Sequence, residues 1–302
     1  MELDVHDFGK WLALLSAVAF SFASLSVSKT KRSGGDKGVM FSVLVTLVIS
    51  FAIWVIWGGS FQMGPEMLRG VMWFVLAGLF AMVLGRSLLF TSIRQLGVLR
   101  SSALKRLNPV FAILLAYFLL GERFSQLDVV GMVAIVLGFS LLIYDGFSRR
   151  TAEGPDSTPG VSAYMVGVLA ALAYASAYVT RKLGLTMMDS ASLGTFVSAA
   201  SGFLFFGALA MFPTRYRGHF RNIFRNLDVW IVASAVSMSV GQILLFAALA
   251  YEDVSTVVMI SSLEVFVSFF LALVVFRSES VPSPIVFIAA LLAVFGVILV
   301  VV

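Results

Sequence analysis

The chain has 302 residues, of which 60% are hydrophobic and 12% are charged, about half the charged fraction of a soluble domain, which excludes an ordinary soluble fold. Its lack of cysteine excludes disulfides, thiolate catalysis and cysteine-based metal or iron–sulfur sites. The net charge of +5 is spread over short connections, so it bears on membrane orientation and gives no reason to expect a nucleic-acid partner.

Ten apolar blocks of about 20 residues follow one another, the length that a helix needs to cross a hydrocarbon core of ~30 Å. The expected helices cover residues 9–28, 38–57, 70–93, 98–120, 126–144, 161–180, 190–212, 227–250, 254–276 and 282–302. The first ten residues are acidic and no small-residue cleavage site follows the first block, which predicts a permanent helix in place of a signal peptide. The predicted fold class is an all-α polytopic membrane protein with ten transmembrane helices, in an inner or plasma membrane.

A polar segment that carries proline and glycine, residues 148–160, divides the chain into two units of five helices, residues 1–147 and 161–302. The units are related, because a shift of 156 positions aligns GRSLLF (Gly85–Phe90) with GQILLF (Gly241–Phe246). We therefore interpret the two units as repeats of one another.

The same shift aligns Leu107 with Leu263, and a shift of 154 aligns Phe20 with Tyr174. An odd number of helices per repeat makes the second repeat enter the membrane upside down. Inverted repeats of this kind are typical of secondary transporters, which bind substrate near the midplane between the repeats. The pattern predicts two inverted five-helix repeats around a central site.

One motif carries a family resemblance: NPVFAILLAYFLLGERFS (Asn108–Ser125), followed by GMVAIVLGFSLLI and weakly echoed by ALVVFRSES (Ala272–Ser280). With it the chain resembles the ten-helix, EamA-type members of the drug/metabolite transporter superfamily. A proline in helix four and a Gly-Glu pair at its end recur there, matching Pro109 and Gly121–Glu122, whereas Val265 stands at the second-half equivalent of Pro109. The resemblance implies gradient-driven transport of a small metabolite, without naming it.

The distribution of positive charge predicts an orientation, because Lys and Arg near the membrane tend to remain cytoplasmic. The connections after the odd-numbered helices carry thirteen Lys and Arg residues. The opposite side has five, which are Lys10, Arg69, Arg123, Arg181 and Lys182. The bias places both termini outside the cell.

Four charged residues fall inside the apolar blocks: Arg86, Lys105, Arg106 and Glu264. A charge in the hydrocarbon layer costs several kcal/mol and normally faces a functional interior. With a rise of ~1.5 Å per residue, the three cations lie roughly 10–12 Å below one surface, and Glu264 lies near the midplane. Since adjacent helical residues point about 100° apart, we expect only one of Lys105 and Arg106 to face the cavity squarely.

These charges predict a cationic cavity, in which Arg supplies a fork that suits carboxylate or phosphate and Lys a compact charge. Two other interpretations stay open: Lys105 extends to the surface from which its helix enters, or Arg86 and Glu264 form a structural pair. Pro109 frees the carbonyl of Lys105, which predicts either a helix break at the site or only a kink.

Further candidates for contact with the substrate are polar or aromatic residues of the same helices. They are Asn108, which is the repeat equivalent of Glu264, and Phe20, Ser102, Tyr174, Tyr178, Gln242 and Ser261. Such groups often only join one helix to another. The pair Gly121–Glu122 is expected to stop a helix and anchor a loop.

The leading functional hypothesis is a secondary transporter of a small anionic or zwitterionic metabolite. The alternatives are a proton-coupled exporter of amines or lipophilic cations centred on Glu264, and a flippase for a phosphorylated lipid. An enzyme is not expected, because the blocks contain no histidine, cysteine or aspartate pair, and no nucleotide-binding motif is present. The expected partners are the substrate, the bilayer and a coupling proton or counter-substrate, in a monomer or weak homodimer without cofactor or metal.

Overall fold

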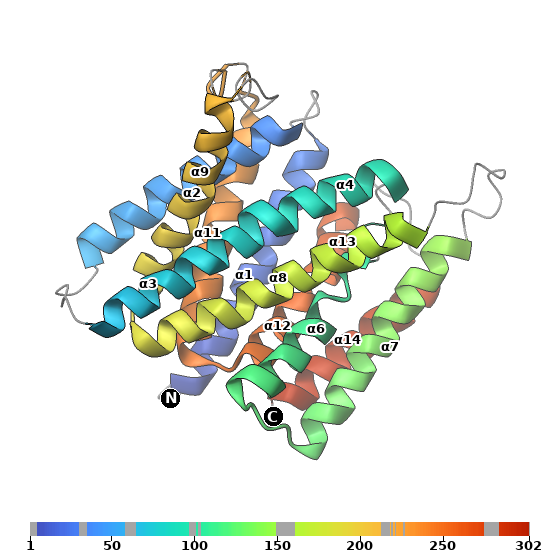
Figure 1. Cartoon of the computed structure of the whole chain (residues 1–302). Helices are drawn as coiled ribbons and strands as arrows, with labels where there is room; N and C mark the ends of the chain where they lie inside the picture. Colours follow the sequence, from blue (N-terminus) through green and yellow to red (C-terminus); the bar gives the residue numbers. More distant parts are fainter. Residues whose placement is uncertain are drawn as a thin grey trace.

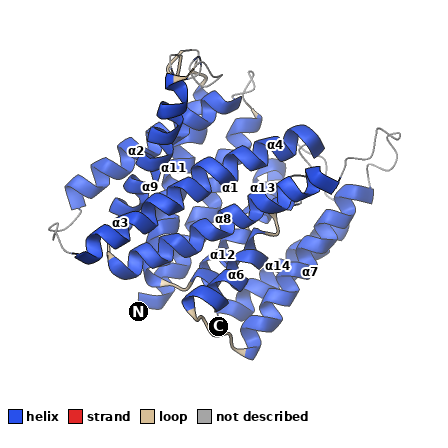
Figure 2. Ribbon diagram, in the orientation of Figure 1, coloured by secondary structure: helices blue, strands red, loops and turns tan. Residues whose placement is uncertain are grey.

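The structure, a computed structural model, consists of helices joined by short connections (Figures 1 and 2). It describes residues 5–29, 35–57, 65–96, 101, 104–148, 161–212, 218, 220, 222–225, 227–274 and 284–301, and this part of the chain contains no strand. The all-helical fold class is therefore confirmed.

In the part of the chain that the structure describes, the first half supplies several helical elements. They are α1 (Val5–Ser28), α2 (Gly35–Trp57), α3 (Pro65–Gly78), the π-helical turn η1 (Leu79–Gly85), α4 (Arg86–Leu96), α6 (Asn108–Leu115), the π-helical turn η2 (Ala116–Leu120) and α7 (Gln126–Ser148). The second half supplies α8 (Val161–Met187), α9 (Ala191–Met211), α11 (Val229–Tyr251), α12 (Val254–Ser262), α13 (Glu264–Val274) and α14 (Pro284–Val301).

Within the described ranges, six helices are long and apolar enough to cross a membrane. They cover Phe8–Val27, Gly38–Trp57, Glu66–Leu89, Val161–Met187, Ala191–Met211 and Val229–Tyr251. Four shorter apolar helices cover Asn108–Leu120, Gln126–Leu141, Val254–Ser268 and Phe287–Leu299. Several crossings by apolar helices make the chain a multi-pass membrane protein.

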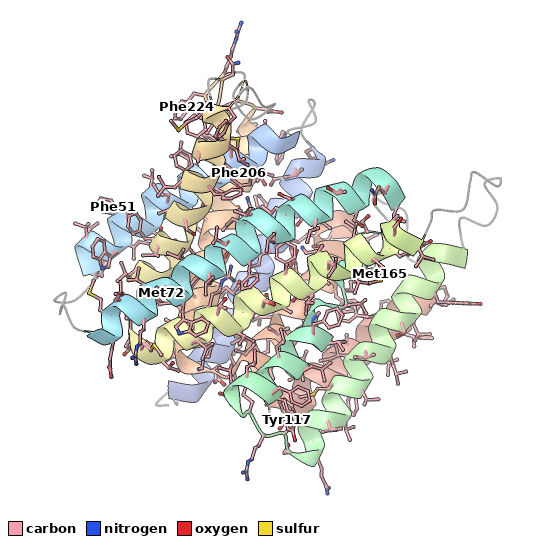
Figure 3. The ribbon with its side chains drawn as sticks, in the orientation of Figure 1. Phe51, Met72, Tyr117, Met165, Phe206 and Phe224 are labelled. Atoms are coloured by element: carbon pink, nitrogen blue, oxygen red, sulfur yellow. The ribbon has the colours of Figure 1, made fainter. Side chains whose placement is uncertain are left out.

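Large apolar side chains project outward around the bundle (Figure 3). Phe51, Met72, Tyr117 and Met165 are 46%, 58%, 51% and 52% exposed. Continuous apolar exposure of this kind marks a surface that contacts lipid. The interior is closely packed by contrast, with Phe74 fully buried at its centre.

The contacts between the two halves are symmetric. If each helix is replaced by its equivalent in the other half, the same pairs of helices are in contact. Helix α1 packs on α11, and its equivalent α8 packs on α3. The contacts of α2 with α9 and of α7 with α14 each join two equivalent helices. The contact of α6 with α8 likewise has its counterpart in that of α13 with α1. In Figure 1, α1 runs upward from the N-terminus, whereas α8 descends from the right to the lower left, so the first helices of the halves run in opposite senses.

Several predicted helix boundaries differ from the structure, and the end of the sixth block differs in a way that matters for the charges. Helix α8 extends to Met187, seven residues beyond the expected end of the block at residue 180, so Arg181 and Lys182 are helical residues and not part of a loop. Lys182 is held by acceptors inside the protein. Lys182 Nζ donates to the carbonyls of Leu249, at 3.0 Å, and Glu252, at 2.8 Å, near the C-terminal end of α11, where a cation is favoured.

Candidate functional site

Two helices are interrupted at equivalent positions of the repeats. In the first half the chain turns at Leu107 before α6 begins, and in the second half it turns at Leu263 between α12 and α13. Leu107 has φ −72° and ψ −12°, and Leu263 has φ −62° and ψ −14°. Interrupted helices at corresponding positions indicate the binding site of a transporter built from inverted repeats.

Each interruption has a tight local turn. The N–H of Leu107 donates to the carbonyl of Leu104 at 3.0 Å, and that of Leu263 to Ile260 at 3.1 Å. Proline 109 contributes to the first turn because it lacks an N–H. The second turn has no proline and is held partly by α1, since the Ser21 hydroxyl donates to the backbone carbonyl of Glu264 at 2.7 Å.

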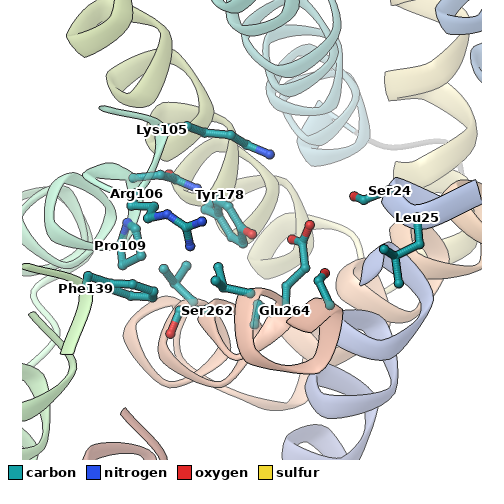
Figure 4. A pocket seen from close by; sticks show the side chains of 14 residues that line it. Ser24, Leu25, Lys105, Arg106, Pro109, Phe139, Tyr178, Ser262 and Glu264 are labelled. Carbon is teal, nitrogen blue, oxygen red and sulfur yellow. The ribbon is translucent and has the colours of Figure 1, made fainter. Parts of the chain in front are cut away.

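A partly open cavity of 360 Å³ lies where the two turns meet (Figure 4). It is bounded by residues of both halves: Ser24, Leu25, Lys105, Arg106, Asn108, Pro109, Phe139, Tyr178, Val258, Ser261, Ser262, Glu264, Val265 and Ser268. Seven of these, which are Lys105, Arg106, Asn108, Pro109, Tyr178, Ser261 and Glu264, are residues that the sequence analysis singles out.

Lys105 and Arg106 both line this cavity, with the Glu264 carboxylate across it (Figure 4). The expectation that only one of the two cations faces the cavity is wrong, because regular helical geometry ends at the turn that begins with Arg106. Lys105 Nζ lies 5.6 Å from the ring centroid of Tyr174, and Arg106 Cζ lies 5.8 Å from that of Phe139. Glu264 is an electrostatic neighbour of Arg106.

Several polar atoms at the cavity have no hydrogen-bond partner. Among the described residues these include Arg106 Nη1, Asn108 Oδ1 and Ser261 Oγ. A buried polar atom without a partner is destabilising by about 1–3 kcal/mol. Native proteins retain such atoms where a ligand or an ordered water completes the bonding, so these three atoms are suited to contact a bound molecule.

The structure places the other predicted site residues away from the cavity wall. Arg86, Phe20, Tyr174 and Gln242 do not line it, and Ser102 lies outside the described residues. The suggested structural pair of Arg86 with Glu264 is also wrong. Arg86 Nη1 points to the Val39 carbonyl on α2, in a long contact of 3.5 Å.

A second polar cluster surrounds Arg181, whose side chain is 2% exposed. Arg181 Nη2 donates to Gln242 Oε1 at 3.1 Å. The guanidinium carbon lies 4.9 Å from the ring centroid of Phe246 and 5.7 Å from that of Tyr178. Sequence reasoning missed Arg181, because an Arg-Lys pair at the end of an apolar block is typical of a loop. The available signal was helical spacing, which puts Arg181 near the face of Tyr174 and Tyr178.

The cavity has access from one side. Ser24, near the C-terminal end of α1, is exposed, and Lys105 and Glu264 are half-buried. On the opposite side Val254 and Val257 of α12 are fully buried within the core. The molecule is therefore open towards the end of the bundle where α1 terminates.

The Gly-Glu pair at the end of η2 lies on this opposite side, beside the start of α12. Gly121 adopts φ 70°, a left-handed conformation that glycine accepts without strain, and ends the helix. Glu122 accepts bonds from the backbone N–H of Val254 at 2.8 Å and of Ser255 at 3.1 Å, at the start of α12. The prediction of a helix stop and loop anchor is confirmed.

The fold and this cavity are those of a multi-pass membrane transporter. A family model described as the EamA-like transporter family matches residues 7–144 and 161–302, and the chain belongs to this family, which confirms the resemblance seen in its sequence. Members of the family transport small molecules across cell membranes.

Known structures share the fold. In all, 29 chains of solved structures match. One, described only as the crystal structure of a protein, has 16% sequence identity and a TM-score of 0.72, and the match covers 97% of this chain and 96% of that one. No curated protein matches the chain. Among the described residues, no group of three or more His, Asp or Glu could hold a metal ion.

Proposed function

We propose that the protein is a secondary transporter of a small organic anion or zwitterion, with ten transmembrane helices in two inverted repeats. The observation that carries this proposal is the pair of cations, Lys105 and Arg106, in a cavity between the halves that contains a single carboxylate, Glu264. Two positive groups against one negative leave a surplus of one positive charge. Because Arg86 lies elsewhere, this surplus is one charge smaller than the sequence suggested.

The cargo's carboxylate or phosphate is expected to bind between Arg106 and Lys105. The free Nη1 of Arg106 supplies a charge-assisted donor, and Lys105 supplies a point charge. For a zwitterion, Glu264 and the unpartnered oxygens of Asn108 and Ser261 face the cationic end. The cavity volume of 360 Å³ limits the cargo to a small metabolite.

Alternating access supplies the transport step. The helix contacts between the two halves are symmetric. We therefore expect a second conformation, with similar packing, that opens to the other side of the membrane. With Arg181 and Lys182 inside α8, the charge bias becomes thirteen to three, and it favours an opening towards the cytoplasm with the termini outside. Without a nucleotide-binding motif, the driving force is a gradient.

A second candidate is the proton-coupled export of amines, which the position of Glu264 in the cavity favours. A carboxylate at this depth can bind a cationic cargo or exchange a proton. The two neighbouring cations, Lys105 and Arg106, repel a cationic cargo. Because the charge of the cavity is positive overall, we rank an anionic cargo before a cationic one.

The proposal is tested by thermal unfolding of the purified protein with inorganic phosphate, succinate and an alkylamine. A bound probe at 100 times its Kd stabilises the protein by ~2.7 kcal/mol. We expect phosphate or succinate to stabilise the wild type and to lose this effect in the double variant Lys105→Gln/Arg106→Gln.

The matched control is Arg69→Gln/Arg123→Gln, which removes two exposed positive charges far from the cavity and should respond like the wild type. Stabilisation by the amine alone, or an undiminished anion effect in the Lys105/Arg106 variant, would contradict the proposal.

A further inference from the structure

Arg181 is a buried cation for which the packing supplies no matching anion. It is 2% exposed, and its Nε has no hydrogen-bond partner. Its neighbours are the neutral Gln242, the rings of Phe246 and Tyr178, and a second cation, Arg86. A buried charge without a counter-ion is destabilising by several kcal/mol. Its retention therefore requires a reason other than stability.

The next residue, Lys182, is a cation with a structural role. Lys182 donates to two backbone carbonyls near the end of α11, those of Leu249 and Glu252. It thereby satisfies acceptors that the helix leaves open. Arg181 makes one side-chain hydrogen bond, to Gln242, and satisfies no helix end. Lys182 therefore already fills the structural role of a cation between α8 and α11, and Arg181 is not needed for it.

The repeat relation gives Arg181 a defined counterpart. The shift of 154 that aligns Phe20 with Tyr174 also aligns Ser24 with Tyr178 and Val27 with Arg181. Ser24 lines the cavity and is exposed, and Val27 is 54% exposed on the open side. Their equivalents on α8 are Tyr178, which lines the same cavity, and Arg181, which lies outside the cavity lining and is buried towards the closed side. When the halves exchange roles, these two residues take the positions at the mouth.

We propose that Arg181 is an anion-binding residue of the vestibule that opens on the opposite side of the membrane. In that conformation its guanidinium receives the carboxylate or phosphate of the cargo. In the present one, Gln242 and Phe246 hold it in place. Tyr178 lies between the two sites, because it lines the cavity and its ring is 5.7 Å from Arg181. The anionic group then passes from Arg106 to Arg181, so this inference rests on the proposed function.

The first test measures access to this region and needs no cargo. Because the chain has no cysteine, single cysteines can be introduced without a background reaction. Leu185→Cys keeps Arg181 intact and lies one turn beyond it on the same face of α8, in a position that is 7% exposed. Val179→Cys is the control, because Val179 is also buried, at 1%, and two positions before Arg181 on the helix it points about 200° away from it.

The protein is reconstituted in liposomes, and a membrane-impermeant maleimide is added on the side opposite the cavity mouth. We expect Leu185→Cys to react about ten-fold faster than Val179→Cys, and to react from that side alone. Equal, slow labelling of both cysteines would overturn the inference, because the region around Arg181 would then never open.

The second test measures the charge itself. Uptake of radiolabelled phosphate or succinate is compared for wild type, Arg181→Gln and Arg181→Cys, with the probe offered on the side opposite the cavity mouth. We expect about a ten-fold loss in apparent affinity for both variants. Reaction of Arg181→Cys with 2-aminoethyl methanethiosulfonate, which restores a positive charge, should recover most of the loss.

The two proposals fail differently in these assays. Wild-type affinity in Arg181→Gln, together with a loss in Lys105→Gln/Arg106→Gln, overturns the role of Arg181 and leaves the cavity intact. If neither the wild type nor any variant binds phosphate or succinate, the proposed function is overturned. A loss in Arg181→Gln that added positive charge does not rescue identifies Arg181 as a packing residue and also overturns the inference.

Discussion

The two helix interruptions have nearly the same backbone conformation, but their charged side chains differ. Leu107 and Leu263 stand 156 positions apart in nearly the same conformation. The first is preceded by Lys105 and Arg106, and the second is followed by Glu264. The repeat therefore sets where the helices are interrupted, whereas individual side chains set the charge of the cavity between them.

The two regions are also linked directly. The helix that begins at the first interruption ends at Gly121, and the next residue, Glu122, binds the N-terminal end of α12, which leads to the second interruption. A carboxylate is favoured at a helix N-terminus, where N–H groups lack intrahelical partners. Glu122 therefore joins the two interrupted segments by hydrogen bonds.

Neutralising Arg106 is expected to have the largest effect on the cationic side of the comparison. Arg106→Gln should weaken phosphate or succinate binding about 10- to 100-fold, because a charge-assisted hydrogen bond contributes about 1.5–3 kcal/mol. Lys105→Gln should lose less, since Lys105 Nζ lies over the ring of Tyr174. Calorimetric titration of each purified variant measures the difference, and a greater loss in Lys105→Gln would reverse the assignment.

Replacing Glu122 tests the link between the two regions. Glu122→Gln should lower the free energy of unfolding by about 2 kcal/mol, because a neutral amide binds the α12 N–H groups more weakly. The control is Glu66→Gln, an exposed acidic residue in the first turn of α3, which should change stability by less than about 0.5 kcal/mol. Thermal unfolding in detergent measures both, and equal stability of the two variants would show that the cap is dispensable.

Neutralising Glu264 sharpens the difference in charge between the two turns. Glu264→Gln should tighten binding of phosphate or succinate about five-fold, since removal of a like charge from the cavity is worth ~1 kcal/mol. Binding is measured as for Arg106→Gln. Loss of anion binding, or transport of an amine that only the wild type supports, would favour the proton-coupled exporter.

Making the two turns alike should have the smallest effect. Pro109→Val gives the first turn the residue that stands at the equivalent position of the second, Val265. Because the second helix is interrupted without proline, we expect anion affinity within about two-fold of the wild type. A ten-fold change would show that the first interruption depends on proline.

Much of this protein follows from its sequence. The apolar blocks predict the helices because each must be long enough to cross the bilayer, and the shift of 156 predicts that Leu107 and Leu263 are equivalent. The cavity charges are also recognisable, because a charged residue inside an apolar block is too costly to be accidental. Glu122 is recognisable as an anchor because it follows a helix-ending glycine.

The tertiary structure alone decided which of these charges meet. Lys105 and Arg106 line one cavity because the helix turns between them and Asn108, whereas Arg86, at a similar predicted depth, points to α2. Arg181 looked like a loop residue because its position depends on partners more than 60 residues away in the chain, Gln242 and Phe246. Sequence patterns report the environment averaged along one helix, but the partner of a buried charge is set by which helices pack together.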